Sequence, residues 1–288
     1  MPTTNTPLRY PGGKSSLSSF LKQVIELNDL QEGTYVEPYA GGAGAAINLL
    51  YDGSVRHIVI NDFDPAIYAF WISILNNTDE FICKIESVPL TIEEWYCQKN
   101  ILRTFDLQNL FDIGFATFFL NRCNRSGILK AGPIGGLKQA GEYSIGARFN
   151  RKNLVKKIRL IQQHKERISV YNLDAIELLQ KVIPKIDGPK LIYLDPPYFK
   201  KGPQLYLNSY EHDDHENLAW ALDKLSSSVC WVLTYDDAQE IRALYQDSSI
   251  LTYTLNYSAA QSRQGRELLI SHPKLRLPNI IGSRFIWV

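Results

Sequence analysis

The sequence predicts an α/β protein with a smaller helical insertion. Residues 35–51 read as a strand, a glycine-rich turn and a helix, and residues 57–62 read as a second strand. From about residue 76 to residue 165 this rhythm stops, and it resumes with strands over residues 168–174 and 191–194. Strand, glycine turn and helix in this order are typical of nucleotide-binding α/β sheets. With 288 residues, the chain is long enough for one large α/β domain and an inserted smaller one.

The N-terminal stretch over residues 7–14 is a tight loop rich in proline and glycine. An amphipathic helix is expected over residues 17–27, with Ser15 or Ser16 as its cap. Gly-Gly-Lys before a helix is reminiscent of a phosphate-binding loop. The full G-x-x-x-x-G-K-[ST] spacing is absent because position 8 is leucine, so we predict no nucleoside triphosphate site.

The first glycine-rich turn, over residues 38–44, follows the strand that ends at Glu37. Its glycines let the backbone approach a ligand closely and leave free N–H groups at the start of a helix. An acid precedes the turn, and no Lys or Arg lies nearby to hold a phosphate. The turn therefore suits an amino-acid group joined to adenosine better than a pyrophosphate. An ordinary tight turn is the alternative that the glycines alone leave open.

The second strand ends at Asp62, 18 positions after Gly44. A carboxylate at the end of this strand is placed to accept both ribose hydroxyls of an adenosine. Asp62 could instead cap the helix that begins at Pro65. Asp64, directly before that proline, fits the cap better, which leaves Asp62 for the ligand.

The insertion is expected to hold a helix over residues 78–110, an apolar helix over 113–123, a glycine-rich exposed loop over 131–141 and a basic helix over 152–164. Residues 120–167 contain twelve Lys or Arg and two acids, a local net charge of +10 in a chain whose net charge is +1. A solvated basic face is the usual explanation, but Asn, Arg and Gly in the adjoining loops favour contact with DNA. The residues expected to contact DNA are Arg122, Asn124, Arg125, Lys138, Arg148, Asn150 and Lys152.

The α/β pattern resumes with a third strand over residues 168–174, which ends in Asp174, and a helix over 175–182. Residues 199–208 are expected to form a loop or lid beside the site. The last strand, over 267–271, should form a hairpin with the sixth strand. The other expected elements are helices over 213–225 and 238–245, strands over 230–234 and 250–255, and a polar loop over 258–266.

The chain is organised around the strand over residues 191–194 and the Asp-Pro-Pro-Tyr sequence that follows it. Pro196 and Pro197 end the strand, which places Asp195, the Pro196 carbonyl and the Tyr198 ring where open α/β sheets bind ligands. Two acceptors for the N–H bonds of an exocyclic amine would favour its nucleophilic form. The tyrosine could stack on an extrahelical base. A proline-rich turn with a solvated aspartate is the alternative for these four residues alone.

Cysteine usage and hydropathy exclude several classes of protein. The four cysteines show no C-x-x-C spacing, so we expect reduced thiols and no metal site. No run of 18 apolar residues and no signal peptide are present. We therefore expect a cytoplasmic protein that does not contact a membrane.

Six motifs, taken together, resemble the Dam-type family of DNA adenine-N6 methyltransferases. In chain order they are RYPGGK (residues 9–14), EPYAGGAG (37–44), Asn61-Asp62, NRCNRSG (121–127), DPPY (195–198) and RELLI (266–270). The resemblance implies a Rossmann-like seven-stranded methyltransferase sheet with an antiparallel last strand. It also implies a catalytic domain of residues 1–75 and 166–288 that binds S-adenosylmethionine, and a helical DNA target-recognition domain of residues 76–165.

The resemblance also implies roles for individual residues. Tyr10 and Lys14 would help to hold S-adenosylmethionine, Asp62 would bind its ribose and Asp174 its adenine amine. Asp195 would lie between the cofactor and the target amine, with Pro196, Pro197 and Tyr198 completing the catalytic loop. The methionine end of the cofactor would be wrapped by Glu37, Pro38, Tyr39, Ala40, Gly41, Gly42 and Gly44.

Double-stranded DNA is the expected partner, and a cognate restriction endonuclease would be an optional one that the activity does not require. A bacterial or phage origin is expected. Residues 127–148 do not match the recognition loop of the GATC-specific members, so the resemblance assigns no target sequence.

Two other functions remain open. One is methylation of another amine: cytosine N4, an RNA adenine or a protein amide. Aspartate rather than asparagine at position 195 and the Dam-like N-terminus favour DNA adenine. The other is an inactive DNA-binding protein that senses the cofactor, against which the intact Asp-Pro-Pro-Tyr sequence and glycine turn argue.

Overall fold

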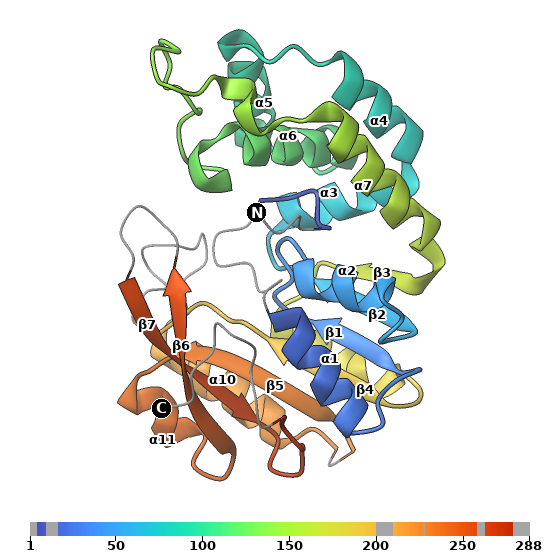
Figure 1. Cartoon of the computed structure of the whole chain (residues 1–288), viewed down its shortest axis with the longest axis vertical. Coiled ribbons are helices and arrows are strands. Elements are labelled where there is room, and N and C mark those ends of the chain that lie inside the picture. The colour runs from blue at the N-terminus through green and yellow to red at the C-terminus, as the bar shows by residue number, and fades with distance from the viewer. Residues whose placement is uncertain (1–4, 10–16, 200–209, 227, 258–262, 279–288) are drawn as a thin grey trace. The chain divides into compact units, whose positions relative to one another are not determined.

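The computed structural model describes residues 5–9, 17–199, 210–226, 228–257 and 263–278. These residues include a seven-stranded sheet of order β3-β2-β1-β4-β5-β7-β6 (Figure 1). Strand β7 runs antiparallel to both β5 and β6, whereas β1, β2, β4 and β5 are parallel. The predicted mixed sheet with an antiparallel last strand is confirmed. The strands are β1 (Thr34–Glu37), β2 (His57–Asn61), β3 (Ile168–Tyr171), β4 (Lys190–Leu194), β5 (Cys230–Asp236), β6 (Ser249–Tyr257) and β7 (Arg263–Ser271).

Strand order reverses at β1, which pairs with β2 on one side and with β4 on the other. Tyr35 on β1 lies opposite Ile58 on β2 and Leu191 on β4. In open α/β sheets, ligands bind outside the carboxyl ends of the strands at such a reversal. The segments that follow Glu37 and Leu194 therefore start from adjacent points at one edge of the sheet.

The chain divides into two compact units. The first comprises Met1–Ser16, Ala40–Asn48 and Asp62–Asn172, and the second comprises Leu17–Tyr39, Leu49–Asn61 and Leu173–Val288. Five of the helices lie in the first unit: α3 (Pro65–Asn76), α4 (Thr78–Ser87), α5 (Ile92–Thr104), α6 (Leu110–Cys123) and α7 (Arg151–Gln163). The second unit holds α1 (Ser18–Leu27), α8 (Ala175–Lys181), α10 (His212–Asp223) and α11 (Gln239–Leu244), and α2 (Gly44–Tyr51) begins in the first unit and ends in the second. Short 3-10 helices occur at Arg125–Gly127, Ile145–Arg148, Lys165–Arg167 and Ile183–Lys185.

The prediction of a single helix over residues 78–110 is wrong. Two helices occupy this stretch, because α4 ends at Ser87 and α5 begins at Ile92. Pro89 lies between them, and proline and the residue before it are both unsuited to continuing a helix. Thr91 then caps α5 by accepting a hydrogen bond from the Glu94 N–H at 3.2 Å.

Caps set the starts of two other helices. Asp64 accepts a hydrogen bond from the Ala66 N–H at 2.8 Å, with Pro65 in the first turn, so the predicted cap of α3 is confirmed. Asn109 caps α6, which makes that helix begin at Leu110 rather than at residue 113. The two serines expected to cap α1 lie outside the described residues.

Most remaining predicted helices and strands are present with bounds shifted by a few residues. The polar loop expected over residues 258–266 is partly wrong, because β7 already begins at Arg263 and pairs there with Tyr257 of β6. The expected lid over 199–208 lies outside the described residues except for Phe199. In the part of the chain that is described, no helix is long and apolar enough to cross a bilayer.

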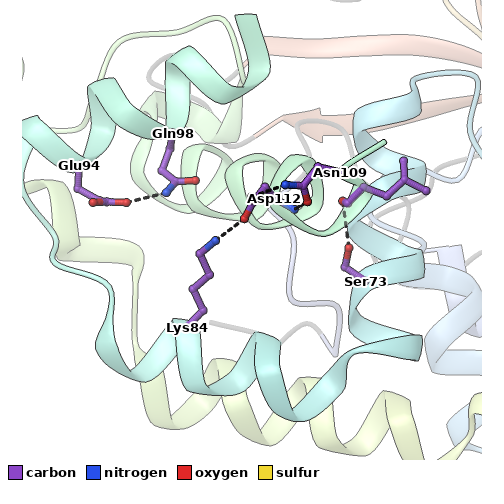
Figure 2. Close-up of polar contacts among 7 residues, drawn as sticks. Ser73, Lys84, Glu94, Gln98, Asn109 and Asp112 are labelled. Carbon is purple, nitrogen blue, oxygen red and sulfur yellow. Dashed lines mark hydrogen bonds and ion pairs between the residues drawn. The ribbon is translucent and has the colours of Figure 1, made fainter. Parts of the chain in front are cut away.

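Helices α3, α4 and α6 share an aromatic core that includes Phe70, Phe81 and Phe118. Phe70 and Phe118 stack with their ring centroids 5.9 Å apart. At the margin, Lys84 pairs with Asp112 at 2.7 Å (Figure 2). The Lys84 ammonium also lies 4.8 Å from the centroid of the Phe115 ring. The basic loops begin where α6, the helix at the centre of this packing, ends at Cys123.

Candidate active site

Within the second unit, β1 ends at a buried acid, Glu37, and β4 is followed by a half-buried acid, Asp195. Glu37 is the last residue of β1, is only 5% exposed, and accepts a hydrogen bond from the Tyr35 hydroxyl at 2.9 Å. Burial, reinforced by Glu37, raises the pKa of Tyr35 well above its usual value, so the phenol stays a donor. A carboxylate is therefore held at the point where the predicted cofactor turn begins.

Asp195 follows β4 directly and is held from the neighbouring strand. The Thr234 hydroxyl on β5 donates a hydrogen bond to Asp195 Oδ1 at 2.8 Å. The Tyr193 hydroxyl lies 2.9 Å from the same Thr234 oxygen. Both tyrosine and threonine are buried, so these hydrogen bonds form in a medium of low dielectric constant.

The rest of the Asp-Pro-Pro-Tyr loop is anchored further along β5. Asp236, itself buried, accepts a hydrogen bond from the Phe199 backbone N–H at 2.9 Å. Pro196 is buried and Pro197 is partly exposed. The Tyr198 ring is 6% exposed and lies 6.4 Å from the ring of Tyr235, tilted by 45°.

A second group of aromatic side chains packs around this loop in the same unit. The hydroxyls of Tyr39 and Tyr210 lie 2.6 Å apart. His215 Nδ1 lies 2.7 Å from the Tyr235 hydroxyl, and burial lowers the pKa of the histidine. Tyr39 is thus half-buried among these side chains, and the Tyr198 ring of the Asp-Pro-Pro-Tyr loop is buried in the same unit.

Asn61 ties together the segments that follow two strands. Its amide donates to the carbonyls of Pro38 and Leu173, each at 2.9 Å, and its oxygen accepts from the Leu173 N–H at 2.9 Å. Asp174 comes next and caps α8 by accepting hydrogen bonds from Ile176 and Glu177 N–H groups at 2.8 and 3.4 Å. The carboxylate expected to bind the adenine amine therefore also serves as a helix cap.

In the first unit, Asp62 closes the glycine turn. Its Oδ2 accepts from the Gly41 N–H at 2.8 Å, and its Oδ1 accepts from the Asp64 N–H at 2.9 Å. Gly41 has φ +48°, a left-handed conformation that glycine adopts without steric cost. The Trp71 indole also donates to the Gly41 carbonyl at 3.0 Å. The turn, which includes the buried Ala40 and Gly42, is thus shaped by the same acid that was predicted to bind a ribose.

The pKa of Asp62 is raised to about 7, with burial as the main cause. The N–H groups of Asp64 and Gly41 oppose this shift by stabilising the charged form, but they do not cancel it. Near neutral pH the group is therefore divided between its neutral and charged forms. A ligand whose hydroxyls donate to this carboxylate would favour the charged form.

The residues expected to contact DNA fall into two groups. Most are exposed: Arg125, Lys138, Arg148, Asn150 and Lys152. Asn124, in contrast, is fully buried, and its amide donates to the Ile128 and Leu129 carbonyls at 3.0 and 2.9 Å. The Trp95 indole donates to its oxygen at 2.7 Å. Asn124 therefore has no exposed surface with which to reach DNA, and it shapes the loop instead.

Arg122 is also committed to contacts within the protein. Its guanidinium donates to the Arg148 carbonyl, with Nε at 2.7 Å, and to the Pro7 carbonyl at 3.4 Å. Burial, with Arg9 nearby, lowers the pKa of Arg122 to about 10, so the group remains charged at neutral pH. This arginine holds two segments of the first unit together.

The N-terminal segment is bound by the asparagine-rich motif. Asn121 accepts from the Arg9 N–H at 2.7 Å and donates to the Arg9 and Gly127 carbonyls at 2.8 and 2.9 Å. Gly127 has φ +78°, and a Cβ there would lie 2.4 Å from the Arg9 carbonyl oxygen. Only glycine fits this contact. The next residue along, Tyr10, and Lys14 lie outside the described residues.

Sequence reasoning missed Thr234, Asp236, Tyr193 and Asn121 as residues that shape these sites. Asn121 lies in the recognised NRCNRSG motif, but the sequence analysis predicted no structural role for its side-chain amide. Thr234 and Asp236 are polar residues near the end of a buried strand, and this pattern could have indicated that they bind a neighbouring loop. Which strand lies beside the Asp195 loop depends on strand order, which the linear sequence does not display.

Comparisons with known proteins identify the family of this chain. The family model for D12 class N6 adenine-specific DNA methyltransferases matches residues 10–259. Type II methyltransferase M.MjaIII of Methanocaldococcus jannaschii is 23% identical over an alignment of 221 residues, and the match covers 72% of this chain and 73% of that protein.

Similar solved structures include two methyltransferases. The rRNA methyltransferase aviRa of Streptomyces viridochromogenes has a TM-score of 0.42 and 12% identity, covering 91% of this chain and 86% of that one. A SAM-dependent methyltransferase of Agrobacterium tumefaciens has a TM-score of 0.42 and 11% identity, covering 92% of this chain and 64% of that one. Because the family model spans most of the 288 residues, the chain belongs to the D12 class of N6 adenine-specific DNA methyltransferases.

Proposed function

We propose that this protein methylates the N6 amine of an adenine that has rotated out of duplex DNA, with Asp195 as the residue that receives the amine. The observation that carries this proposal is the position of Asp195, which follows β4 beside the end of β1 and is bonded by Thr234. A carboxylate held in this way can accept an N–H bond of the target amine.

The family uses S-adenosylmethionine, which when bound supplies an electrophilic methyl group. The donors and acceptors present fit such a ligand. Glu37 and Asp62 are acidic acceptors suited to an ammonium group and to ribose hydroxyls, respectively. The remaining residues proposed to hold it are Tyr10, Lys14, Pro38, Tyr39, Ala40, Gly41, Gly42, Gly44 and Asp174.

We assign the reaction itself to four residues. Asp195 and the Pro196 carbonyl accept the two N6 hydrogens and so favour the nucleophilic form of the amine. Pro197 limits the conformations of the loop, because its φ angle is fixed. Tyr198 stacks on the extrahelical base. The contribution of the protein is positioning and local electrostatics.

The DNA partner is proposed to be double-stranded and to bind mainly through residues 76–165. Arg125, Lys138, Arg148, Asn150 and Lys152 are exposed and can reach phosphates and base edges. Rotating the adenine out of the duplex costs a few kcal/mol, which these contacts must offset. We also propose a cytoplasmic location and, as an optional partner, a cognate restriction endonuclease.

The test is expression in a bacterial host that lacks its own DNA methyltransferases, followed by long-read detection of modified bases. N6-methyladenine at one recurrent sequence is the expected result. Asp195→Ala should lower the methylation rate by about 1,000-fold or more, on the order of 4 kcal/mol.

Three outcomes would contradict the proposal. Nucleoside mass analysis could find N4-methylcytosine in the DNA, or methylated adenine in RNA instead of DNA. Alternatively, Asp195→Ala could methylate DNA at nearly the normal rate, which would remove Asp195 from the reaction.

A further inference from the structure

We propose that β5 acts as a clamp on the catalytic loop, with Thr234 and Asp236 as positioning residues at its two ends. Thr234 bonds the carboxylate of Asp195, and Asp236 bonds the backbone of Phe199. Neither residue belongs to the Asp-Pro-Pro-Tyr sequence. The catalytic consequence of the clamp rests on the role proposed for Asp195.

The geometry of two parallel strands produces this arrangement. Strands β4 and β5 lie side by side in the sheet (Figure 1). They are paired in parallel, with Leu194 opposite Leu233, so Thr234 comes next to Asp195. Side chains two positions apart on a strand point to the same face, so Thr234 and Asp236 face the same way. The pair can therefore hold both ends of one short loop.

The hydroxyl of Thr234 is oriented by a second hydroxyl. Its one proton goes to Asp195 Oδ1 at 2.8 Å, because a carboxylate oxygen is a stronger acceptor than the Tyr193 hydroxyl and is closer than the Leu194 carbonyl at 3.5 Å. The Tyr193 hydroxyl, 2.9 Å away, then donates to Thr234. Hydrogen bonds in such a chain polarise one another, which strengthens the bond to the carboxylate.

The loop depends on anchors of this kind because of its composition. Pro196 and Pro197 have no N–H groups to donate, so the backbone has few donors between Asp195 and Tyr198. A carboxylate that turned about its own side-chain bonds would spend part of its time facing away from the target amine. Small errors in the position of a reacting group lower rates strongly.

The test compares Thr234→Val with Thr234→Ser in single-turnover methylation of DNA at saturating cofactor. Valine keeps the shape of threonine but removes the hydroxyl, and we expect it to lower the rate by about 30-fold with unchanged affinity for DNA. Serine keeps the hydroxyl and should restore most of the rate. The matched control is Thr117→Val, because Thr117 is also fully buried but donates only to the Ile113 carbonyl of its own helix.

Hydrogen exchange at the Phe199 amide gives a readout that does not depend on activity. Asp236→Ala removes its acceptor and should speed this exchange at least ten-fold, whereas Thr234→Val should leave it unchanged. If the Phe199 amide exchanged at the same rate in Asp236→Ala and in the unmodified protein, the role of Asp236 in the clamp would be overturned.

Asp195→Ala is measured alongside these variants. A slow Asp195→Ala with a fully active Thr234→Val would overturn the clamp alone. A fully active Asp195→Ala would overturn the proposed function, and the exchange result would still decide whether Asp236 anchors the loop. Two further outcomes would contradict the clamp. Thr234→Ser could be as slow as Thr234→Val, or the control Thr117→Val could be as slow as Thr234→Val.

Discussion

At the scale of single residues, two asparagines in the basic segment have opposite environments. Asn124 is fully buried and its side chain makes three hydrogen bonds, whereas Asn150 is exposed and caps α7. A buried polar group that loses its partners costs more than an exposed one, since water cannot replace them. Replacing asparagine should therefore destabilise the fold more at position 124 than at position 150.

Asn124→Ala should lower the free energy of unfolding by about 2–4 kcal/mol, because it leaves the Trp95 N–H and two carbonyls without their partners. Asn150→Ala, the matched control, should cost only about 1 kcal/mol, the usual value for a helix cap. Urea unfolding measures both. Equal costs at the two positions would contradict the burial argument.

Asp62 is the residue whose chemistry should depend most on pH. Its pKa of about 7 means that the carboxyl is mostly neutral at pH 6 and mostly charged at pH 8. Ribose hydroxyls donate hydrogen bonds, so they favour the charged form. Affinity for an adenosine ligand at this site should therefore rise as pH rises through 7.

We expect S-adenosylhomocysteine to bind about ten-fold more tightly at pH 8 than at pH 6, with release of a proton, as measured by titration calorimetry in two buffers. In Asp62→Asn this dependence should disappear, since an amide does not titrate in this range. A pH dependence that persists unchanged in Asp62→Asn would assign it to another group.

At the scale of elements, α6 and the turns after it combine a rigid support with an exposed basic surface. Asn121 and Arg122 are directed inward and bind backbone carbonyls. Arg125, three positions after Arg122, and Lys138, in the loop that follows, are exposed. Such a division lets a loop present charge to a ligand while its backbone is held from beneath.

Removing single exposed cations should weaken DNA binding in a salt-dependent way. Lys138→Ala and Lys152→Ala should each reduce the slope of log K against log salt concentration by about 0.9 if the side chain neutralises one phosphate. Fluorescence anisotropy with labelled duplex DNA at several salt concentrations measures the slope. Lys274→Ala, an exposed lysine after β7 in the second unit, is the control and should leave the slope unchanged. A normal slope in both test variants would exclude phosphate contacts by these lysines.

At the scale of the whole molecule, ligand binding should stabilise the folded chain. S-adenosylhomocysteine at about 100 times its dissociation constant should add about 2.7 kcal/mol to the free energy of unfolding and raise the melting temperature. ATP should have no such effect, because the phosphate-loop spacing is absent and position 8 is leucine. Differential scanning fluorimetry distinguishes the two ligands, and equal stabilisation by ATP would contradict the assignment of the turn.

Local sequence patterns were enough to predict the alternation of strands and helices, the family and the acids at the strand ends. Periodicity and turn chemistry are local properties, so strand β4, the cap at Asp64 and the stop at Pro196 could be predicted from neighbouring residues. The break between α4 and α5 was missed although Pro89 marks it in the sequence. The helical pattern on both sides of this proline was given more weight.

Only the tertiary structure decided which strand lies beside which loop, and which polar side chains point inward. Thr234 and Asp195 are 39 positions apart, and they meet because β4 and β5 are paired. Asn124 and Trp95 meet because α5 packs on α6. A hydrogen bond between distant residues depends on the packing of whole elements, and a linear pattern carries no direct measure of that packing.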